Sequence, residues 1–405
     1  MKSNYKPIGS YITRVEKRNS DLKVTKLLGL SMTKEFRETT SNIVGTDMSV
    51  YRVMKKWQFA CDFMSPIRVN KLPVVLKMDD EPNIVSPAYP VFEVVNKETL
   101  DPEYLMMWFR RPEFDRYATF KCDAAIRGGY DWEALCETLI PVPSIFKQKE
   151  IVKEYNTIVN RIELNNKLIQ KLEETAQAIY KQWFVDFEFP DENGKPYKSS
   201  GGEMEMSDEL EKEIPVGWEV KSFTQVLNLG GGGTPDTTNE KYWGGEIPFF
   251  APPDVSESYY SITTEKTITE KGLKNCSSKL YPKDTIFVTA RGTVGAIAIA
   301  GRAMAMNQSC YAINDTKRNS KFFAHQLTID TISRLKNEAT GAVFSALVTR
   351  DFDGQKIIEP IENLILKFDV TTKGLYSSIL NTEKENACLS SMKDLLLSKL
   401  ATIEN

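Results

Sequence analysis

The feature that most constrains this chain is an apolar stripe with heptad spacing between Glu150 and Trp183. Its seam positions lie three and four residues apart, and only one of them, Asn165, carries a polar side chain. The positions are Ile151, Tyr155, Ile158, Ile162, Asn165, Ile169, Leu172, Ala176, Ile179 and Trp183. This spacing predicts one long helix that packs against another helix as in a coiled coil. An ordinary core helix averages only ~11–12 residues, so a purely local packing role is disfavoured.

A weaker stripe of the same spacing lies near the end of the sequence. Its apolar members are Leu375, Ile379, Leu389, Leu396 and Leu400, and Thr382, Asn386 and Lys393 interrupt them. Asn165 and Asn386 each place an amide on an otherwise apolar seam, which commonly fixes register at a cost in stability. Two helices that each need to cover a stripe are expected to pack on each other.

Each predicted helix follows a block of about 145 residues, and the two blocks share short motifs. The segment 84–92 resembles 306–313, with Ser86 and Asn307 separated by 221 residues, and 55–59 resembles 282–287. Pro143 and Pro360 precede the two helices and are 217 residues apart. These offsets predict an internal duplication, although a chance resemblance is the alternative at this level of identity.

The predicted fold class is mixed α/β (α+β), because β-like runs and short helical runs alternate without the regular βαβ order of a doubly wound sheet. A turn-rich, polar segment after Pro190 predicts a linker. The predicted divisions are a globule at 1–145, a long helix at 146–187, a linker at 188–214, a second globule at 215–361 and a second long helix at 362–405.

Charge and composition limit the function classes. The chain has 405 residues and a formal net charge of −3, so any nucleic-acid contact must use local positive surface. No apolar run approaches the ~20 residues that cross a bilayer, and no secretory signal opens the sequence, so no membrane association is expected. The six scattered cysteines indicate reduced thiols and a cytoplasmic protein.

The sequence offers no catalytic set and no metal site. The run Gly230–Pro235 lacks the Gly-Lys-Ser/Thr ending of a phosphate loop. Ala251–Asp254 holds two prolines without the flanking residues of an adenine methyltransferase motif. His325 is the only histidine, and its apolar neighbours favour a structural role. No His/Cys cluster has metal-ligand spacing.

A set of motifs in fixed order resembles the specificity subunit of type I restriction–modification enzymes, over essentially the whole chain. The segments that carry the resemblance are Gln177–Phe189, Ile214–Trp218, Gly232–Pro235, Tyr242–Phe249, Ile268–Leu273, Arg291–Gly295 and Asn307–Tyr311. The first globule departs from the pattern, because it lacks the Gly-Gly-Thr-Pro and Tyr-Trp-Gly-Gly runs. Its contact residues are therefore less well defined.

The resemblance implies two target-recognition domains that each contact one half of a bipartite, asymmetric site in double-stranded DNA. It implies that the two helices pack antiparallel as a coiled coil and set the gap between the half-sites. The chain itself is expected to be non-catalytic and to hold no cofactor. Two methyltransferase (M) subunits would use S-adenosylmethionine, and restriction/translocase (R) subunits would use ATP and Mg²⁺.

The resemblance and base-recognition chemistry together suggest contact residues. Arginine pairs with guanine O6/N7, and Asn and Gln pair with adenine N6/N7. The predicted DNA contacts of the second globule are Gly233, Thr234, Tyr242, Arg291, Thr293, Asn307, Gln308, Ser309 and Ser345, and those of the first globule are Lys55, Lys56, Arg68 and Arg127. For Asn307 and Gln308 the alternative is a network that braces a loop.

The aromatic residues near the end of the first helix, Trp183, Phe184 and Phe187, are predicted to dock methyltransferase subunits. The alternative is that they only complete the packing between the helices and the adjoining globule. Two other functions remain open for the chain as a whole. One is a coiled-coil scaffold that binds only protein, and the other is a self-contained DNA methyltransferase or nuclease, which the missing motifs oppose.

Overall fold

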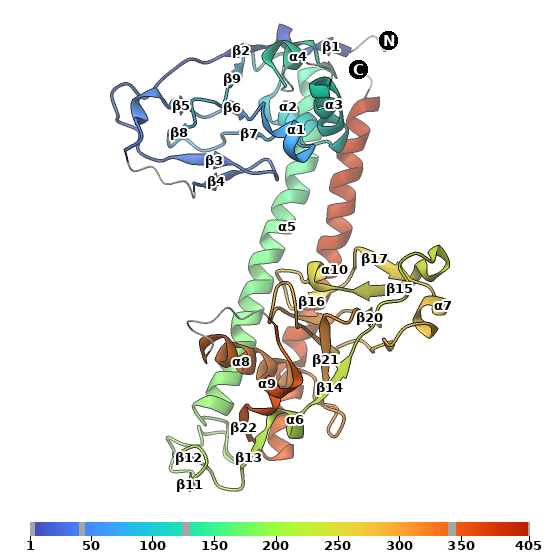
Figure 1. Ribbon diagram of the computed structural model, residues 1–405. Helices are drawn as coiled ribbons and strands as arrows, with labels where there is room; N and C mark the ends of the chain where they lie inside the picture. Colours follow the sequence, from blue (N-terminus) through green and yellow to red (C-terminus); the bar gives the residue numbers. More distant parts are fainter. Residues whose placement is uncertain (1–4, 40–44, 124–129, 339–345, 404–405) are drawn as a thin grey trace. The chain divides into compact units, whose positions relative to one another are not determined.

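The computed structural model describes residues 5–39, 45–123, 130–338 and 346–403. They form two compact units, Met1–Ile162 with Leu389–Asn405, and Glu163–Cys388. Two long helices contribute to both units (Figure 1): α5, Ile145–Tyr180, and α10, Glu362–Lys399. A π-helical turn, η3 (Lys181–Val185), continues α5, and a 3-10 turn, η6 (Leu400–Thr402), follows α10. The two compact units divide each long helix, so they do not test the predicted boundaries between globules and helices, which stay a prediction.

The first unit is built on a four-stranded antiparallel sheet in the order β2-β9-β6-β7. These strands are β2 (Ile12–Arg14), β6 (Gln58–Cys61), β7 (Val74–Leu76) and β9 (Val91–Val94). The strand pairs β1 (Tyr5–Pro7) with β10 (Leu139–Pro141), β3 (Leu28–Leu30) with β4 (Phe36–Glu38) and β5 (Arg52–Met54) with β8 (Asn83–Val85) surround it. The helical segments are η1 (Ile8–Ser10), η2 (Met48–Val50), α1 (Ser65–Val69), α2 (Pro102–Phe109), α3 (Pro112–Asp123) and α4 (Trp132–Glu137).

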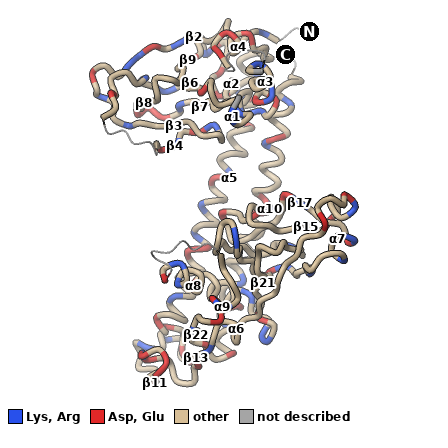
Figure 2. The backbone as a smooth tube through the Cα atoms, viewed as in Figure 1, with Lys and Arg blue, Asp and Glu red and all other residues tan. Residues whose placement is uncertain are grey.

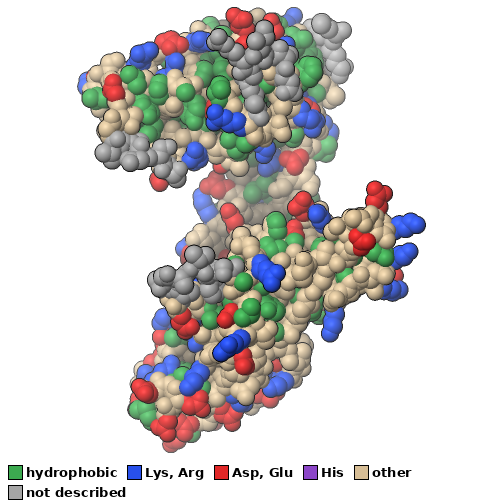
Figure 3. Space-filling view, viewed as in Figure 1, with side chains coloured by type: hydrophobic (Ala, Val, Ile, Leu, Met, Phe, Trp, Pro, Cys, Tyr) green, Lys and Arg blue, Asp and Glu red, His purple; other side chains and the backbone are tan. Residues whose placement is uncertain are grey.

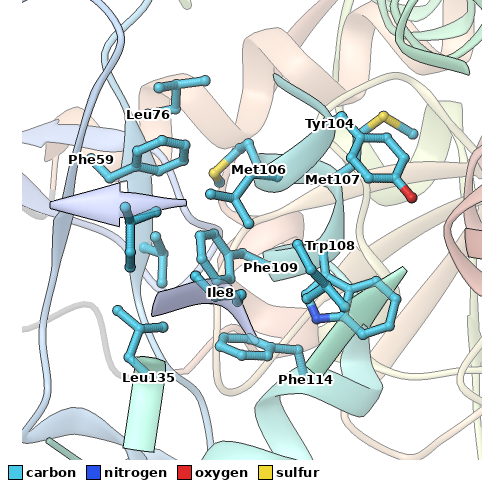
Figure 4. Packing of buried hydrophobic residues seen from close by; sticks show 14 of the residues in the cluster. Ile8, Phe59, Leu76, Tyr104, Met106, Met107, Trp108, Phe109, Phe114 and Leu135 are labelled. Atoms are coloured by element: carbon cyan, nitrogen blue, oxygen red, sulfur yellow. The ribbon is translucent and has the colours of Figure 1, made fainter. Parts of the chain in front are cut away.

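Aromatic packing forms the core of the first unit (Figure 4). Phe59 of β6 and Phe109 of α2 lie in this core with their rings edge to face. Phe59 also stacks on Phe92 of β9 with ring centroids 4.9 Å apart, and Phe109 meets Phe92 edge-on. Asp101 starts α2 by accepting the backbone N–H groups of Glu103 and Tyr104, which leaves the apolar face of the helix against the sheet. The same core includes Ile151 and Tyr155 of α5, Leu397 of α10 and Leu400 of η6.

The second unit holds a five-stranded sheet in the order β14-β21-β18-β19-β16 and a smaller sheet in the order β17-β15-β20. The first comprises β14 (Asn228–Gly231), β16 (Tyr260–Ser261), β18 (Ile286–Thr289), β19 (Ile297–Ala300) and β21 (Cys310–Asn314); the second comprises β15 (Trp243–Phe250), β17 (Lys266–Ile268) and β20 (Ala305–Met306). The remaining elements are β11 (Met204–Ser207), β12 (Lys212–Pro215), β13 (Glu219–Ser222), β22 (Lys356–Glu359), α6 (Phe223–Val226), α7 (Glu270–Lys274), α8 (Phe322–Glu338), α9 (Thr349–Asp353), η4 (Glu240–Tyr242) and η5 (Pro252–Asp254).

The internal duplication predicted from the motif offsets is present in the sheets. The order β2-β9-β6-β7 of the first unit recurs as β14-β21-β18-β19 in the second, with antiparallel pairing throughout. The register recurs as well, since Phe59 lies opposite Phe92 and Ile286 lies opposite Ile313. The mixed α+β class with an internal repeat is therefore confirmed.

The turns that lead into β6 and β18 match in detail. Trp57 has a φ of 69° and donates its N–H to the carbonyl of Lys77, 2.8 Å away. Asp284 has a φ of 70° and donates its N–H to the carbonyl of Ala300, 2.9 Å away. A positive φ is uncommon for residues other than glycine, so its recurrence at the same place supports a common ancestry of the two sheets.

Within the second unit, α5 and α10 pack antiparallel. Asn165 donates its side-chain amide to Asn386 Oδ1 at 2.9 Å, and Asn386 donates to Asn166 Oδ1 at 2.8 Å. Further along α5, Tyr180 meets Phe368 of α10 edge-on with ring centroids 6.1 Å apart. The two asparagines are 221 residues apart, the same offset as Ser86 and Asn307. The two asparagines that interrupt the predicted seams therefore bond to each other.

All predicted seam residues are buried or partly buried. Ile151, Ile158, Asn165, Ile169 and Ile379 are buried, and Ile162, Leu172, Ile179, Leu375, Leu389 and Leu396 are partly buried. On α10, however, Tyr376 and Leu380 are more deeply buried than Leu375, and the predicted seam omitted both. Tyr259 and Phe322 of the globule cover this side of α10, so the buried face is wider than a two-helix seam.

A carboxylate pair lies beside this seam. Glu173 of α5 accepts the backbone N–H of Tyr259 at 2.7 Å. Burial raises the pKa of Glu173 to about 7, and the nearby Glu383 of α10 adds to the rise while the Tyr259 hydrogen bond opposes it. Burial also raises the pKa of Glu383. Ionisation of Glu173 near neutral pH therefore opposes folding.

We expect the substitution Glu173→Gln to stabilise the protein at pH 8. The folded-state pKa lies above the ordinary value of 4.5, so the stabilising contribution of the bound proton is complete below about pH 4.5 and is lost as the pH rises through 7. Glutamine keeps the acceptor for Tyr259 without the charge. The free energy of unfolding, measured in urea, should rise by roughly 1–3 kcal/mol at pH 8 and change little at pH 4.5.

Glu163→Gln is the matched control, because Glu163 is exposed on the same helix and pairs with Lys167 at 2.6 Å. It should give no gain at pH 8. Equal stability of Glu173→Gln and the wild type at pH 8 would contradict the raised pKa of Glu173.

Candidate nucleic-acid interface

Three loops of the second unit meet at one edge of its main sheet. Strand β21 is antiparallel to both β14 and β18, so its N-terminal end lies beside the C-terminal ends of those two strands. Residues 232–235 follow β14, residues 290–295 follow β18, and residues 307–309 precede β21. We call these three segments the loop edge of the second unit. They hold most of the residues that the sequence predicted to contact DNA.

Two glycines of the loop edge are required by close backbone packing. A Cβ atom on Gly232 would lie 2.0 Å from the carbonyl oxygen of Asn307, and one on Gly233 would lie 2.7 Å from the backbone nitrogen of Ser277. The N–H of Gly233 donates to the carbonyl of Met306 at 3.1 Å. Gly233 is buried, so its predicted contact with DNA is replaced by a packing role.

The amides of Asn307 and Gln308 have different surroundings. Asn307 Oδ1 accepts the backbone N–H of Ser309 at 3.0 Å and so braces the turn into β21. Gln308 is exposed, and the hydroxyl of Thr234 donates to its Oε1 atom. The bracing alternative therefore fits Asn307, whereas the Gln308 amide is held at the surface by Thr234 and faces solvent.

Arg291 lies on a loop whose conformation is fixed by hydrogen bonds. Its side chain is exposed and has no hydrogen bond or ion pair with any residue that the structure describes. The fully buried Thr289 organises the loop, since its hydroxyl donates to the carbonyl of Thr293 and accepts the N–H of Ala296 at 3.0 Å. The N–H of Ala290 donates to the Ser309 carbonyl at 2.7 Å, which ties this loop to the turn before β21.

The remaining predicted contacts differ in where they lie. Thr293 is exposed on the Arg291 loop. Tyr242 belongs to η4, where its carbonyl accepts the N–H of Thr269 at 2.9 Å at the start of α7, so it contributes to the smaller sheet. Ser345 falls outside the described residues. The structure thus places Thr234, Arg291 and Gln308 on the loop edge, and it places Tyr242 in η4, outside the loop edge.

Exposed lysines around the smaller sheet were missed by the sequence reasoning. They are Lys241, Lys266, Lys271 and Lys274, near α7 and β17. Figure 2 marks basic residues along the backbone around α7, and Figure 3 shows basic side chains in the same region. Glu246, Glu265 and Glu270 alternate with them, so the surface is mixed in sign and suits individual phosphate contacts better than a uniform field. The three lysines within residues 266–274 were the sequence signal that could have indicated this basic surface.

In the first unit, the predicted contacts lie at opposite ends of β6. Lys55 and Lys56 form the turn before this strand, where Lys55 is exposed and Lys56 pairs with Asp80 at 2.9 Å. Arg68 is exposed in the last turn of α1, which follows the strand. Arg127 lies outside the described residues. The described predicted contacts of the first unit are therefore divided between the two ends of this strand.

The predicted docking role of Trp183, Phe184 and Phe187 requires correction. All three side chains are buried, at 4–6% exposure. The rings of Trp183 and Phe184 lie 5.8 and 5.2 Å from Phe368 of α10, and Phe187 meets Trp218 at 5.5 Å. They complete the core of the second unit, as the alternative interpretation held, and they present no surface to a partner.

His325 is a core residue. It is 1% exposed, and its Nδ1 atom lies 2.8 Å from the hydroxyl of Tyr376. Burial lowers its pKa to about 3, so the imidazole is neutral at physiological pH. In the part of the chain that the structure describes, no cluster of His, Cys, Asp and Glu could hold a metal ion, and no helix is both long and apolar enough to span a membrane.

Comparisons with known proteins show what the chain resembles. Residues 215–365 match the family described as "Type I restriction modification DNA specificity domain". The chain is 25% identical over 370 residues to the type I restriction enzyme HindI specificity subunit of Haemophilus influenzae, covering 78% of this chain and 80% of that protein. It is 25% identical over 311 residues to the MjaIX specificity subunit of Methanocaldococcus jannaschii, covering 76% of this chain and 70% of that protein.

A solved structure shares the fold. The S subunit of a type I restriction–modification system from M. genitalium superposes with a TM-score of 0.54 at 13% identity, over 99% of this chain and 96% of that one. Together these define a two-domain specificity-subunit fold. The chain is thus similar over most of its length to type I specificity subunits, and residues 215–365 match their specificity domain. These similarities agree with the resemblance that the sequence motifs predicted.

We expect Thr289→Val to loosen the loop edge. The isosteric change removes the hydroxyl that holds the Arg291 loop, which should lower the free energy of unfolding by about 1–3 kcal/mol. It should also weaken specific DNA binding by the assembled complex. Calorimetric melting and DNA titration measure the two effects.

Thr328→Val is the matched control, because Thr328 is equally buried but its hydroxyl bonds only to Ala324 within α8. It should leave DNA affinity unchanged. Unaltered DNA binding by the Thr289 variant would show that the loop does not depend on this hydroxyl.

Proposed function

We propose that this chain is the sequence-recognition subunit of a type I restriction–modification complex in which each unit contacts one half of a bipartite DNA site. The observation that carries the proposal is the loop edge of the second unit, where exposed Arg291 and Gln308 stand on loops tied to each other by backbone hydrogen bonds. A guanidinium and an amide at fixed positions are the groups that distinguish base pairs in the major groove.

The chemistry assigns different tasks to the side chains at this edge. Arg291 would donate two hydrogen bonds to guanine O6 and N7, since no described acceptor occupies its guanidinium. Gln308 would contact a second base, with Thr234 fixing the amide orientation. Lysines near α7 would position the duplex through phosphates, which carry no sequence information.

The same proposal leaves catalysis to partner subunits. Methyltransferase subunits would supply S-adenosylmethionine-dependent adenine methylation, and restriction subunits would supply ATP- and Mg²⁺-dependent cleavage. The sequence supports this division, because it holds neither a complete phosphate loop nor a complete methyltransferase motif. The only histidine is buried and neutral, so it is not available as a general base.

The long helices are proposed to determine the gap between the half-sites. Helices α5 and α10 contain 36 and 38 residues, about 55 Å at 1.5 Å per residue. Each supplies core residues to both compact units. The register lock at Asn165 and Asn386 supports a fixed pairing of the two helices.

Arg291→Ala tests the proposed base contact. The loss of a two-bond guanine contact is expected to cost about 1–3 kcal/mol, so specific DNA binding by the reconstituted complex should fall roughly tenfold or more. Assembly with the partner subunits should persist, because the side chain is exposed. Titration with labelled duplex measures affinity, and size-exclusion chromatography measures assembly.

Arg302→Ala is the control, since Arg302 is an exposed arginine that follows β19 at the opposite end of the sheet. It should bind DNA as the wild type does. Equal losses in both variants would indicate a general charge effect and argue against base reading by Arg291. Normal binding by both would favour the protein-only scaffold.

A further inference from the structure

Because the two sheets are duplicated, the loop edge of the second unit has an equivalent in the first unit. In the second unit, the loop edge consists of the C-terminal ends of β14 and β18 and the N-terminal end of β21. The equivalent strands of the first unit are β2, β6 and β9, which pair in the same order and directions. The corresponding segments are residues 15–19 after β2, residues 62–70 after β6 and residues 86–90 before β9.

The equivalence extends to individual hydrogen bonds. Before β9, Ser86 Oγ accepts the N–H of Ala88 at 3.3 Å, and the Ser86 carbonyl accepts the N–H of Tyr89 at 3.0 Å. Before β21, Asn307 uses its side chain and carbonyl in the same way toward residues 309 and 310. Ser86 therefore occupies the position of Asn307, and the turn beside it occupies the position of the Gln308 turn.

This edge of the first unit carries unpaired positive charge. Lys17 and Arg18 are exposed, and neither side chain bonds to any residue that the structure describes. Their backbone is fixed, because the Lys17 carbonyl accepts the N–H of Val53 at 2.9 Å and Arg18 forms a β-bridge with Arg52.

Arg52 links the β2 segment to the turn before β9. Its Nε atom donates to the carbonyl of Pro87 at 3.2 Å, and it pairs with Glu16 at 2.6 Å. Arg68, exposed on α1 after β6, lies on the third segment of the same edge. The first unit therefore has its own linked set of loops, with cations in two of the three segments.

Lys55 and Lys56 lie at the other end of β6. Their turn is the equivalent of the turn at Lys283 and Asp284, which precedes β18 and lies away from the loop edge. Four residues of strand at about 3.3 Å each separate the two ends, roughly 13 Å. Lys56 is already paired with Asp80.

We propose that the first unit contacts its DNA half-site through Lys17, Arg18, Arg68 and the turn 86–89, and that Lys55 and Lys56 lie outside the contact surface. This inference rests on the proposed function, because it transfers the loop edge of the second unit to the first. Lys17 and Arg18 follow β2 as Gly232 and Gly233 follow β14, so cations replace glycines in this half of the repeat. The two half-sites would therefore be contacted by different chemistry on the same scaffold.

Two double variants with the same change of net charge test the proposal in the fully assembled complex. Lys17→Glu with Arg18→Glu should lower the affinity for the target sequence at least tenfold. The slope of log affinity against log salt should also decrease by the amount expected for the loss of about two phosphate contacts. Lys55→Glu with Lys56→Glu should remain within about twofold of the wild type. Lys17→Ala with Arg18→Ala repeats the test without charge reversal, and thermal melting verifies folding.

Arg291→Ala, measured in the same assay, distinguishes a failure of the proposed contact surface in the first unit from a failure of the proposed function. Loss of binding in the Arg291 and Lys17/Arg18 variants, with normal binding in Lys55/Lys56, supports the proposal. Loss in the Arg291 and Lys55/Lys56 variants, with normal binding in Lys17/Arg18, overturns it and leaves the proposed function standing. Normal binding in all three would overturn the proposed function as well.

Discussion

The hydrogen-bonded amide pair between Asn165 and Asn386 is the constraint on which the rest of the structure depends. Both side chains are buried, at 2% and 8% exposure, so each needs a partner within the protein. A shift of one helix along the other would separate the amides and place them against apolar seam residues. The pair therefore specifies one alignment of α5 and α10, at the cost of burying polar groups in an apolar seam.

The alignment matters because neither globule completes its core alone. In the first unit, Ile151 and Tyr155 of α5 join Leu397 of α10 and Leu400 of η6. In the second unit, Tyr180 and Phe184 pack with Phe368 among the residues of the globule. A change in helix register would disturb both cores at once, which couples the folding of each globule to the pairing of the helices.

The helices and the repeat could be predicted from the sequence because their signals are local and periodic. The stripe predicted a helix at 146–187, and α5 with its π-helical turn covers 145–185. The motif offsets predicted the duplication that the matching strands show, and the two seam asparagines were predicted to fix register. Such patterns follow directly from the geometry of a helix or a duplicated sheet.

The candidate site was predicted only in part, because charge and composition do not say which end of a strand a residue occupies. Lys55 and Arg68 both carry positive charge in the sequence, but β6 lies between them. Apolar residues at a helix end are equally suited to a core and to a partner surface, which is why Trp183 and Phe184 were assigned to docking. Gly233 was predicted to contact DNA, yet it is a glycine because a Cβ atom there would clash with the backbone of Ser277.

The most direct test of the account is to map methylated adenines by single-molecule sequencing in cells that carry the complete complex. The chain would be compared with a variant that lacks one heptad from each long helix and keeps the seam in phase. We expect two short specified sequences at a fixed gap, and in the variant the same two sequences with the gap shortened by roughly three base pairs. A single contiguous target, or an unchanged gap in the shortened variant, would contradict it.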